Sequence, residues 1–204
     1  GLHARALGPG TMSGRVAAID AVPADPLTIW VGAASGGVWK SADGGTTFDS
    51  VFDEHTQSIG ALRVDPTDPK AVWVGTGESW VRNSVSIGDG VYKTSDGGDN
   101  WTRMGLEATE RIAPIQVDPQ RHDTVYVCAT GALWNASPER GVFKTVDGGK
   151  SWTKILFVDD DTGCSDLSID PQEPAILYAG MWSFRRSPDF FRSGGKGSDL
   201  YKST

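Results

Sequence analysis

The sequence predicts an all-β protein built from repeated units of four short antiparallel strands. Two repeated patterns and the composition support this prediction. An eight-residue pattern around Asp-Gly-Gly occurs three times, and a turn pattern containing Asp and Pro occurs four times. The 204 residues include 26 glycines and 11 prolines, which suit many short strands joined by tight turns. Eight tryptophans, seven phenylalanines and four tyrosines supply core volume.

The Asp-Gly-Gly pattern reads hydroxyl, any residue, Asp, Gly, Gly, any residue, small polar residue, aromatic. Its copies lie at residues 41–48, 94–101 and 145–152. Glycine supplies the positive φ of a hairpin turn, and the aspartate accepts hydrogen bonds from backbone N–H groups of its own turn. We therefore expect three hairpin turns, called here the Asp-Gly-Gly turns. Their aspartates are expected to be structural rather than catalytic, and they are Asp43, Asp96 and Asp147.

The second pattern is a short alternating strand, a turn with Asp and Pro, and another strand ending in an aromatic residue. Its copies lie at residues 19–30, 62–73, 115–126 and 167–178. Proline in the turn costs no hydrogen bond of the sheet. Together the two patterns give four strands per unit, named A to D in chain order. In the first unit these strands are expected at residues 16–20, 28–31, 37–40 and 48–52.

Four antiparallel strands in a repeat of about 40–55 residues form the blade of a β-propeller. The predicted blades cover about residues 13–52, 58–104, 112–156 and 165–204. The last blade is incomplete, because residues 201–204 repeat only the opening of the Asp-Gly-Gly pattern. We therefore expect an open arc of about four blades. The expected partner is the remainder of the same propeller or a partner chain.

The spacing of the two patterns separates the faces of the arc. From the aspartate of one Asp-Gly-Gly turn to the aromatic that ends the next strand B there are 30 or 31 residues. From that aromatic to the next such aspartate there are 13, 23 or 21 residues. The variable segment is the B–C loop, and variable insertions lie on one face of a repeat array. B–C and D–A loops should share that face, with the Asp-Gly-Gly turns opposite.

The long B–C loops carry aromatic and charged residues that suit sugar rings or peptides. The candidate ligand-binding residues are Glu78, Trp80, Arg82, Asn83, Trp134, Arg140, Trp182, Arg185 and Arg186. Structural alternatives stand beside this hypothesis. Glu78 and Arg82 suit an ion pair within one loop, Arg185 and Arg186 suit neutralisation of nearby aspartates, and the tryptophans suit packing between blades.

The sequence contains few recognisable catalytic motifs. No acyl-transfer triad or phosphate-binding glycine loop is present. If the protein hydrolyses glycosides, the candidate acids and bases are Glu78, Asp89 and Glu139, since such enzymes use two carboxylates. No cofactor or metal is expected. The acidic run at residues 159–161 suits a solvated turn better than a calcium site, which needs about six to eight oxygens.

The net charge, the hydropathy and the cysteines bear on which partners and which cellular compartment the protein has. The net charge of −7 argues against nonspecific nucleic-acid binding. No stretch approaches the roughly 20 apolar residues of a membrane span. Cys128 lies in a strand-like run and Cys164 in a segment expected to be a polar loop. Whether the two form a disulfide stays open, because their distance in space decides it.

With these residues in view, the chain resembles the N-terminal part of secreted bacterial sortilin-like proteins with Asp-box (BNR) repeats, often labelled glycosyl hydrolases. The Asp-Gly-Gly turns resemble the Asp-box itself. Further matching stretches are residues 13–16, 34–40, 58–61, 74–78, 82–84, 88–93, 139–144, 161–163 and 193–195. The resemblance covers nearly all of the chain. It implies a β-propeller in an exported protein, either periplasmic or extracellular, but it implies no particular reaction.

The leading hypothesis is a noncatalytic propeller module that binds a peptide, a protein or a glycan through its B–C loops. One alternative is a glycoside hydrolase, sialidase-like or related, or a lyase. Another is an assembly or scaffold factor.

Overall fold

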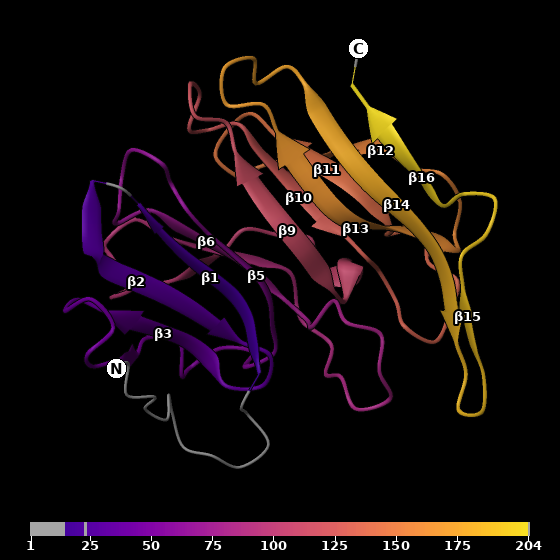
Figure 1. Cartoon of the computed structure of the whole chain (residues 1–204), viewed down its shortest axis with the longest axis horizontal. Coiled ribbons are helices and arrows are strands. Elements are labelled where there is room, and N and C mark those ends of the chain that lie inside the picture. Colours follow the sequence, from indigo (N-terminus) through magenta and orange to yellow (C-terminus); the bar gives the residue numbers. More distant parts are fainter. Residues whose placement is uncertain (1–14, 23, 204) are drawn as a thin grey trace, which may run out of the picture.

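The computed structural model describes residues 15–22 and 24–203 (Figure 1). These residues form four antiparallel sheets and, within the described part, one short 3-10 helix, η1 (Glu107–Thr109). The protein is an incomplete β-propeller, so the predicted fold class is confirmed. Each sheet is one blade, and the blades are numbered 1 to 4 along the chain.

The strands follow one another in each of the first three blades. Blade 1 contains β1 (Val16–Val22), β2 (Asp25–Ala33), β3 (Gly37–Ser41) and β4 (Asp49–Ser50). Blade 2 contains β5 (Ile59–Val64), β6 (Val72–Thr76), β7 (Val91–Thr94) and β8 (Thr102–Arg103). Blade 3 contains β9 (Ile112–Val117), β10 (Val125–Ala129), β11 (Gly141–Thr145) and β12 (Thr153–Leu156).

Blade 4 departs from this order. It contains β13 (Thr162–Ile169), β14 (Leu177–Arg186), β15 (Phe191–Ser193) and β16 (Asp199–Lys202). The start of β14 pairs with β16, and its end pairs with β15 through a hairpin closed by a 2.8 Å bond from Ser187 N to Phe190 O. Trp182, Arg185 and Arg186 were expected in a loop, and that placement is wrong because this hairpin extends β14 through them.

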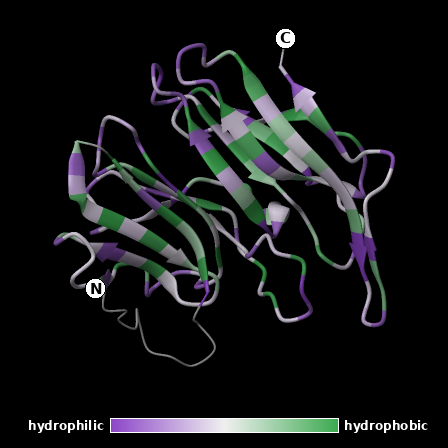
Figure 2. Ribbon diagram, viewed as in Figure 1, coloured by the Kyte–Doolittle hydropathy of each residue, from purple (hydrophilic) through white to green (hydrophobic). Residues whose placement is uncertain are grey.

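The blades pack through their apolar faces. Several strands alternate apolar and polar residues, which is visible as banding in Figure 2, whereas β6 and β10 are buried along their whole length. One apolar cluster joins blades 1 and 2 around Trp30 and Phe52, and a second joins blades 2 and 3 around Trp73 and Phe143. A third cluster joins blades 3 and 4 around Tyr126. The first strands of successive blades, β1, β5, β9 and β13, lie next to one another.

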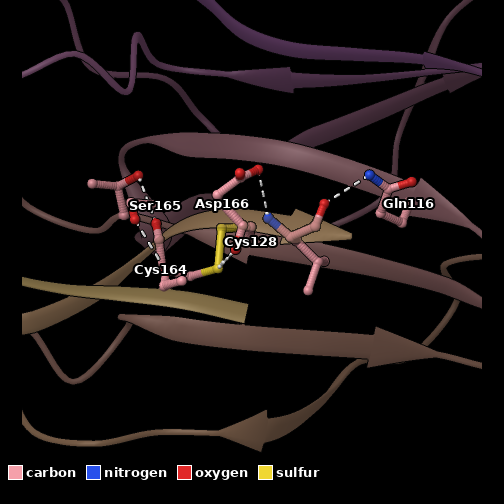
Figure 3. Close-up of a disulfide and its surroundings, with 8 residues drawn as sticks. Gln116, Cys128, Cys164, Ser165 and Asp166 are labelled. Atoms are coloured by element: carbon pink, nitrogen blue, oxygen red, sulfur yellow. Dashed lines mark hydrogen bonds between the residues drawn. A yellow bond between two sulfur atoms is a disulfide. The ribbon is translucent and has the colours of Figure 1, made fainter. Parts of the chain in front are cut away.

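A disulfide joins blades 3 and 4. It connects Cys128 of β10 to Cys164 of β13, with the two Cα atoms 5.1 Å apart (Figure 3). The expected loop position of Cys164 is wrong, because Cys164 pairs with Met181 within the sheet. Close by, Gln116 Nε2 of blade 3 donates to the carbonyl of Leu167 in blade 4 over 2.8 Å. Covalent and polar contacts therefore both tie these blades together.

The two faces of the arc are set by hydrogen bonds between connections. In each Asp-Gly-Gly turn the first glycine donates its N–H to a carbonyl in or just after the A–B turn of the same blade. These bonds run from Gly44 to Leu27, from Gly97 to Lys70 and from Gly148 to Asp123, over 2.9, 3.0 and 3.0 Å. On the other face, Gly77 N of a B–C loop donates to Ser58 O of a D–A loop over 2.7 Å. The spacing of the sequence patterns predicts this division.

The Asp-Gly-Gly turns are held by short-range bonds. Asp43 Oδ1 accepts the N–H groups of Thr46 and Thr47, both at 2.8 Å, and the Ser41 hydroxyl donates to the same oxygen. Led by the backbone bond from Thr47, these donors lower the pKa of Asp43 to about 2. The pKa values of Asp96 and Asp147 are also lowered, chiefly by hydroxyl donors of their own turns.

Candidate functional site

A cavity of about 710 Å³ lies against the first strands of the blades and beside the B–C loop of blade 2. Its floor comes from β1, β5 and β9, with Ser165 of β13 at one side. Three aromatic side chains line it: Trp80 from the B–C loop of blade 2, Trp182 from β14 and Phe191 from β15. The cavity therefore gathers residues from all four blades.

The aromatic residues of the cavity differ in how they are held. Trp80 is 63% exposed, so its ring is available to a ligand. Trp182 stacks on Phe184 with ring centroids 4.7 Å apart and meets Phe191 edge-on at 5.9 Å. Its indole N–H donates to Ser193 Oγ over 3.1 Å. Phe191 was missing from the candidate set, although the adjacent aromatic pair at residues 190–191 was a usable signal.

A contact joins the B–C loop of blade 2 to the end of β14 in blade 4, the two segments that carry Trp80 and Trp182. Arg186 Nε of blade 4 donates to Asn83 Oδ1 of blade 2 over 2.5 Å, across a sequence separation of 103 residues. The long B–C loop of blade 2 thus reaches past blade 3. Of the candidate ligand-binding residues, Trp80 and Trp182 line the cavity, and Asn83 and Arg186 contact each other.

Glu78 lies at the base of the same loop with no exposed surface. Its carboxylate forms an ion pair with Arg15 and lies 3.8 Å from Arg82 Nε. The ion pair with Arg82 is one of the two alternatives that the sequence left open. Arg15 is a partner that no pattern in the sequence indicated. Because two guanidinium groups surround a fully buried carboxylate, Glu78 holds the loop in place and does not face the cavity.

The other two catalytic candidates also lie outside the cavity lining. Burial opposes ionisation of Asp89, but hydrogen bonds from Thr56, Tyr92 and Thr76 outweigh it and lower the pKa of Asp89. Burial, with the bond to Asp89, raises the pKa of Tyr92 to about 12. Glu139 lies on the B–C loop of blade 3, with its N–H on Ser137 Oγ at 3.1 Å. Among the described residues that line the cavity, the one carboxylate is Asp20, 3.7 Å from Arg63.

Two buried arginines, Arg111 and Arg140, contact the ring of Phe184, on which Trp182 stacks. Arg140 has no exposed surface and donates to the carbonyls of Thr130 and Ala132 over 3.0 and 2.7 Å. Its guanidinium lies 4.3 Å from the centre of the Phe184 ring, and that of Arg111 lies 5.2 Å from it. Burial lowers the pKa values of both arginines to about 10, with a further contribution from the positive charge of Arg140 at Arg111 and from that of Arg185 at Arg140. A ligand contact by Arg140 stays a prediction, and these bonds account for its burial without one.

The remaining candidates lie elsewhere. Arg185 pairs with Asp161, which also accepts a 2.9 Å bond from Arg192. These arginines, led by Arg185, lower the pKa of Asp161. Trp134 is 41% exposed and does not line the cavity. The described residues contain no cluster of three acidic, histidine or cysteine side chains suited to a metal ion. They also contain no helix long and apolar enough to cross a membrane.

The four-stranded sheets define a β-propeller. The cavity is a candidate ligand site on its loop face. Residues 36–177 match the model of the family described as Sortilin-Vps10, "Sortilin, neurotensin receptor 3". Since the match covers more than half of the chain, the protein belongs to the Sortilin-Vps10 family.

Relatives with longer chains share this region. The chain is 28% identical over 185 residues to the "Probable oligoxyloglucan-reducing end-specific xyloglucanase" of Neosartorya fischeri, a match that covers 79% of this chain and 19% of the relative. The chain spans about a fifth of the length of the curated relatives it matches.

Two solved structures show the same fold at low identity. An ancestral GH74 enzyme has a TM-score of 0.64 at 19% identity, covering 90% of this chain and 26% of that one. The structure described as "YCF48 bound to D1 peptide" has a TM-score of 0.53 at 13% identity, covering 89% of this chain and 54% of that one.

Proposed function

We propose that these blades form a noncatalytic ligand-binding module and that the cavity under Trp80 and Trp182 binds an oligosaccharide of the xyloglucan type. The observation that carries the proposal is that Trp80 and Trp182 line one cavity, and the Asn83–Arg186 contact between the segments that carry them supports it. Aromatic faces stack against the apolar faces of sugar rings, and about 710 Å³ lies within the usual range of about 300–1,000 Å³ for small-ligand sites.

The polar residues of the cavity support a neutral ligand. Ser79, Gln116 and Ser165 line the cavity, and Gln116 Nε2 and Ser165 Oγ already donate to the carbonyls of Leu167 and Gly180, so their oxygen atoms are the groups offered to ligand hydroxyls as acceptors. The charges of Asp20 and Arg63 compensate each other. A peptide is the competing ligand. It is favoured by the neighbour that is described as bound to a D1 peptide, and it is an outcome of the test below.

Titration calorimetry with xyloglucan oligosaccharides tests the proposal directly. Trp80→Ala should weaken binding at least about tenfold, because it removes an exposed stacking face. Trp134→Ala is the matched control, since it removes an exposed tryptophan outside the cavity. Equal affinity of the two variants would contradict the site, and binding of unstructured peptides but no oligosaccharide would replace the ligand class.

A glycoside hydrolase is the second candidate function, because the relatives in Neosartorya fischeri and Emericella nidulans are named as xyloglucanases. If the chain hydrolyses xyloglucan through Glu78, Glu78→Gln should lower the rate at least about a hundredfold. Release of new reducing ends measures this. The burial of Glu78 between two arginines supports binding without hydrolysis.

We also propose that the protein is exported, to the periplasm or beyond the cell, and that these blades associate with further blades of the same propeller or of a partner chain. The disulfide supports export, because disulfides persist in oxidising compartments. Fractionation of cells that express the full gene tests the first point, and copurification tests the second.

A further inference from the structure

Two arginines of blade 3, Arg111 and Arg140, lie in the interior of the protein with no exposed surface. Both guanidinium groups contact the ring of Phe184, whose centre lies 5.2 Å from the guanidinium of Arg111 and 4.3 Å from that of Arg140. Neither arginine lines the cavity under Trp80. Two buried positive charges beside one ring are costly unless negative charge compensates them.

The two arginines differ in how many of their N–H groups have acceptors. Arg140 donates through Nη1 and Nη2 to the carbonyls of Thr130 and Ala132. Arg111 donates through Nε to Gly131 O over 2.7 Å. Within the described part of the chain, Arg111 Nη1 and Nη2 and Arg140 Nε are buried without a hydrogen-bond partner. Unpaired buried donors are costly, so the terminal nitrogens of Arg111 require an acceptor.

The nearby acidic side chains do not supply that acceptor. Glu78 and Asp161 are each paired with other arginines. Glu110 is half-buried, and its negative charge acts to raise the pKa of Arg111. Among residues 15–22 and 24–203, however, no carboxylate oxygen lies within 4.0 Å of a guanidinium nitrogen of Arg111 or Arg140. The protein therefore provides no close counter-charge for either arginine.

Loss of a proton does not remove the positive charge. Burial, with a contribution from the positive charge of Arg140, lowers the pKa of Arg111 to about 10. This value still lies well above neutral pH, so the guanidinium stays charged. A buried water molecule accepts hydrogen bonds but carries no charge. An anion meets both requirements, because it accepts hydrogen bonds and compensates the two cations.

We propose that Arg111 binds a small inorganic anion such as chloride through Nη1 and Nη2, and that the charge of Arg140 adds to the attraction. The burial of the arginines sets the size of the ligand. Since neither has exposed surface, a monoatomic anion suits the site, and a carboxylate joined to a peptide or a sugar does not. The proposal goes beyond the proposed function, because it needs no oligosaccharide in the cavity.

The melting temperature tests anion binding. Chloride is varied from about 1 to 100 mM and replaced by methanesulfonate, a larger monovalent anion, so that ionic strength and screening stay constant. A ligand that binds only the folded protein stabilises it increasingly as its concentration exceeds the dissociation constant. The melting temperature of the wild type should therefore rise with chloride by at least about 2 °C over this range. Equal melting temperatures in the two salts would overturn the proposal.

Arg111→Met locates the site. It removes the charge and the N–H donors but keeps a long apolar side chain beside Phe184, so its melting temperature should no longer depend on chloride. Arg103→Met is the matched control, because Arg103 has a side chain that is 50% exposed, and it should keep the chloride dependence of the wild type. A dependence that survives in Arg111→Met would place the anion elsewhere and refute the site.

Crystals of the wild-type protein grown in sodium bromide give a measurement that does not depend on whether a variant folds. Bromide replaces chloride and is located by its anomalous scattering. We expect a bromide ion in contact with Arg111 Nη1 and Nη2. Water at this position, or bromide bound only at surface arginines, would overturn the proposal.

Discussion

The two faces of the propeller are built by contacts of different range. On one face, the carboxylate of Asp96 bonds to groups within four residues of itself, in Thr94 and Asn100. On the other face, Glu78 pairs with Arg15, and Asn83 pairs with Arg186 at a separation of 103 residues. Contacts of short range can be repeated by copying a sequence, while contacts of long range let each loop differ. The comparison explains why the turn face is constant and the loop face varies.

The largest effect is expected on the loop face at Phe184. Its ring is fully buried, stacks on Trp182 and contacts the guanidinium groups of Arg111 and Arg140. Phe184→Ala should lower the free energy of unfolding by about 3–5 kcal/mol, because it opens a cavity beneath two buried cations. Denaturant unfolding measures this, with Phe157→Ala at an exposed phenylalanine as the control.

The same variant sharpens the comparison between the faces. Since Trp182 rests on Phe184, oligosaccharide binding should fall in the protein that remains folded. The amide exchange of the Asp-Gly-Gly turns should stay as in the wild type, because their bonds are internal. If both faces lost protection equally, the faces would form one cooperative unit and the distinction drawn above would fail.

A smaller loss of stability, without a loss of binding, is expected at Asp96. Asp96→Ala removes the acceptor for the Asn100 N–H at 3.0 Å and for the Thr94 hydroxyl at 2.7 Å. The melting temperature should drop by a few degrees, because turn donors lose their partner. Affinity for the oligosaccharide should not change. A normal melting temperature with lost binding would show that Asp96 acts on the ligand and is not merely a turn former.

The sequence predicted the turn face of the propeller better than the loop face. The Asp-Gly-Gly and Asp-Pro patterns predicted four-stranded blades and the separation of the faces, because turn chemistry is local. The strand limits of blade 4 were missed because the turn signal Ser187-Pro188-Asp189 was interpreted as part of a long B–C loop and not as a hairpin that extends β14. The disulfide was left open, because Cys128 and Cys164 meet only when blades 3 and 4 are side by side.

The candidate site was predicted only as a set of residue types. Sequence placed Trp80, Asn83, Trp182 and Arg186 on one face, but nothing local shows that a loop of blade 2 touches blade 4. It also offered Glu78 and Arg140 as exposed groups, whereas both are fully buried. Charged residues in loops are usually exposed, and here long-range partners reverse that expectation.

The smallest expected effect is the pH dependence of stability that arises from the turn carboxylates. The pKa of Asp43 is lowered to about 2 in the folded chain, against about 3.9 for an unfolded aspartate. The ionised carboxylate therefore stabilises the fold above about pH 4, and this contribution is lost as the pH falls through about 2. The difference in melting temperature between wild type and Asp43→Asn should accordingly be largest near pH 5 and shrink toward pH 2. Ser41→Ala, which removes one donor to the carboxylate, should give a smaller difference of the same sign. A difference that stays constant between pH 5 and pH 2 would mean that the turn carboxylate contributes nothing to acid stability, and the acid sensitivity would then have to arise from the arginine-paired carboxylates of the loop face.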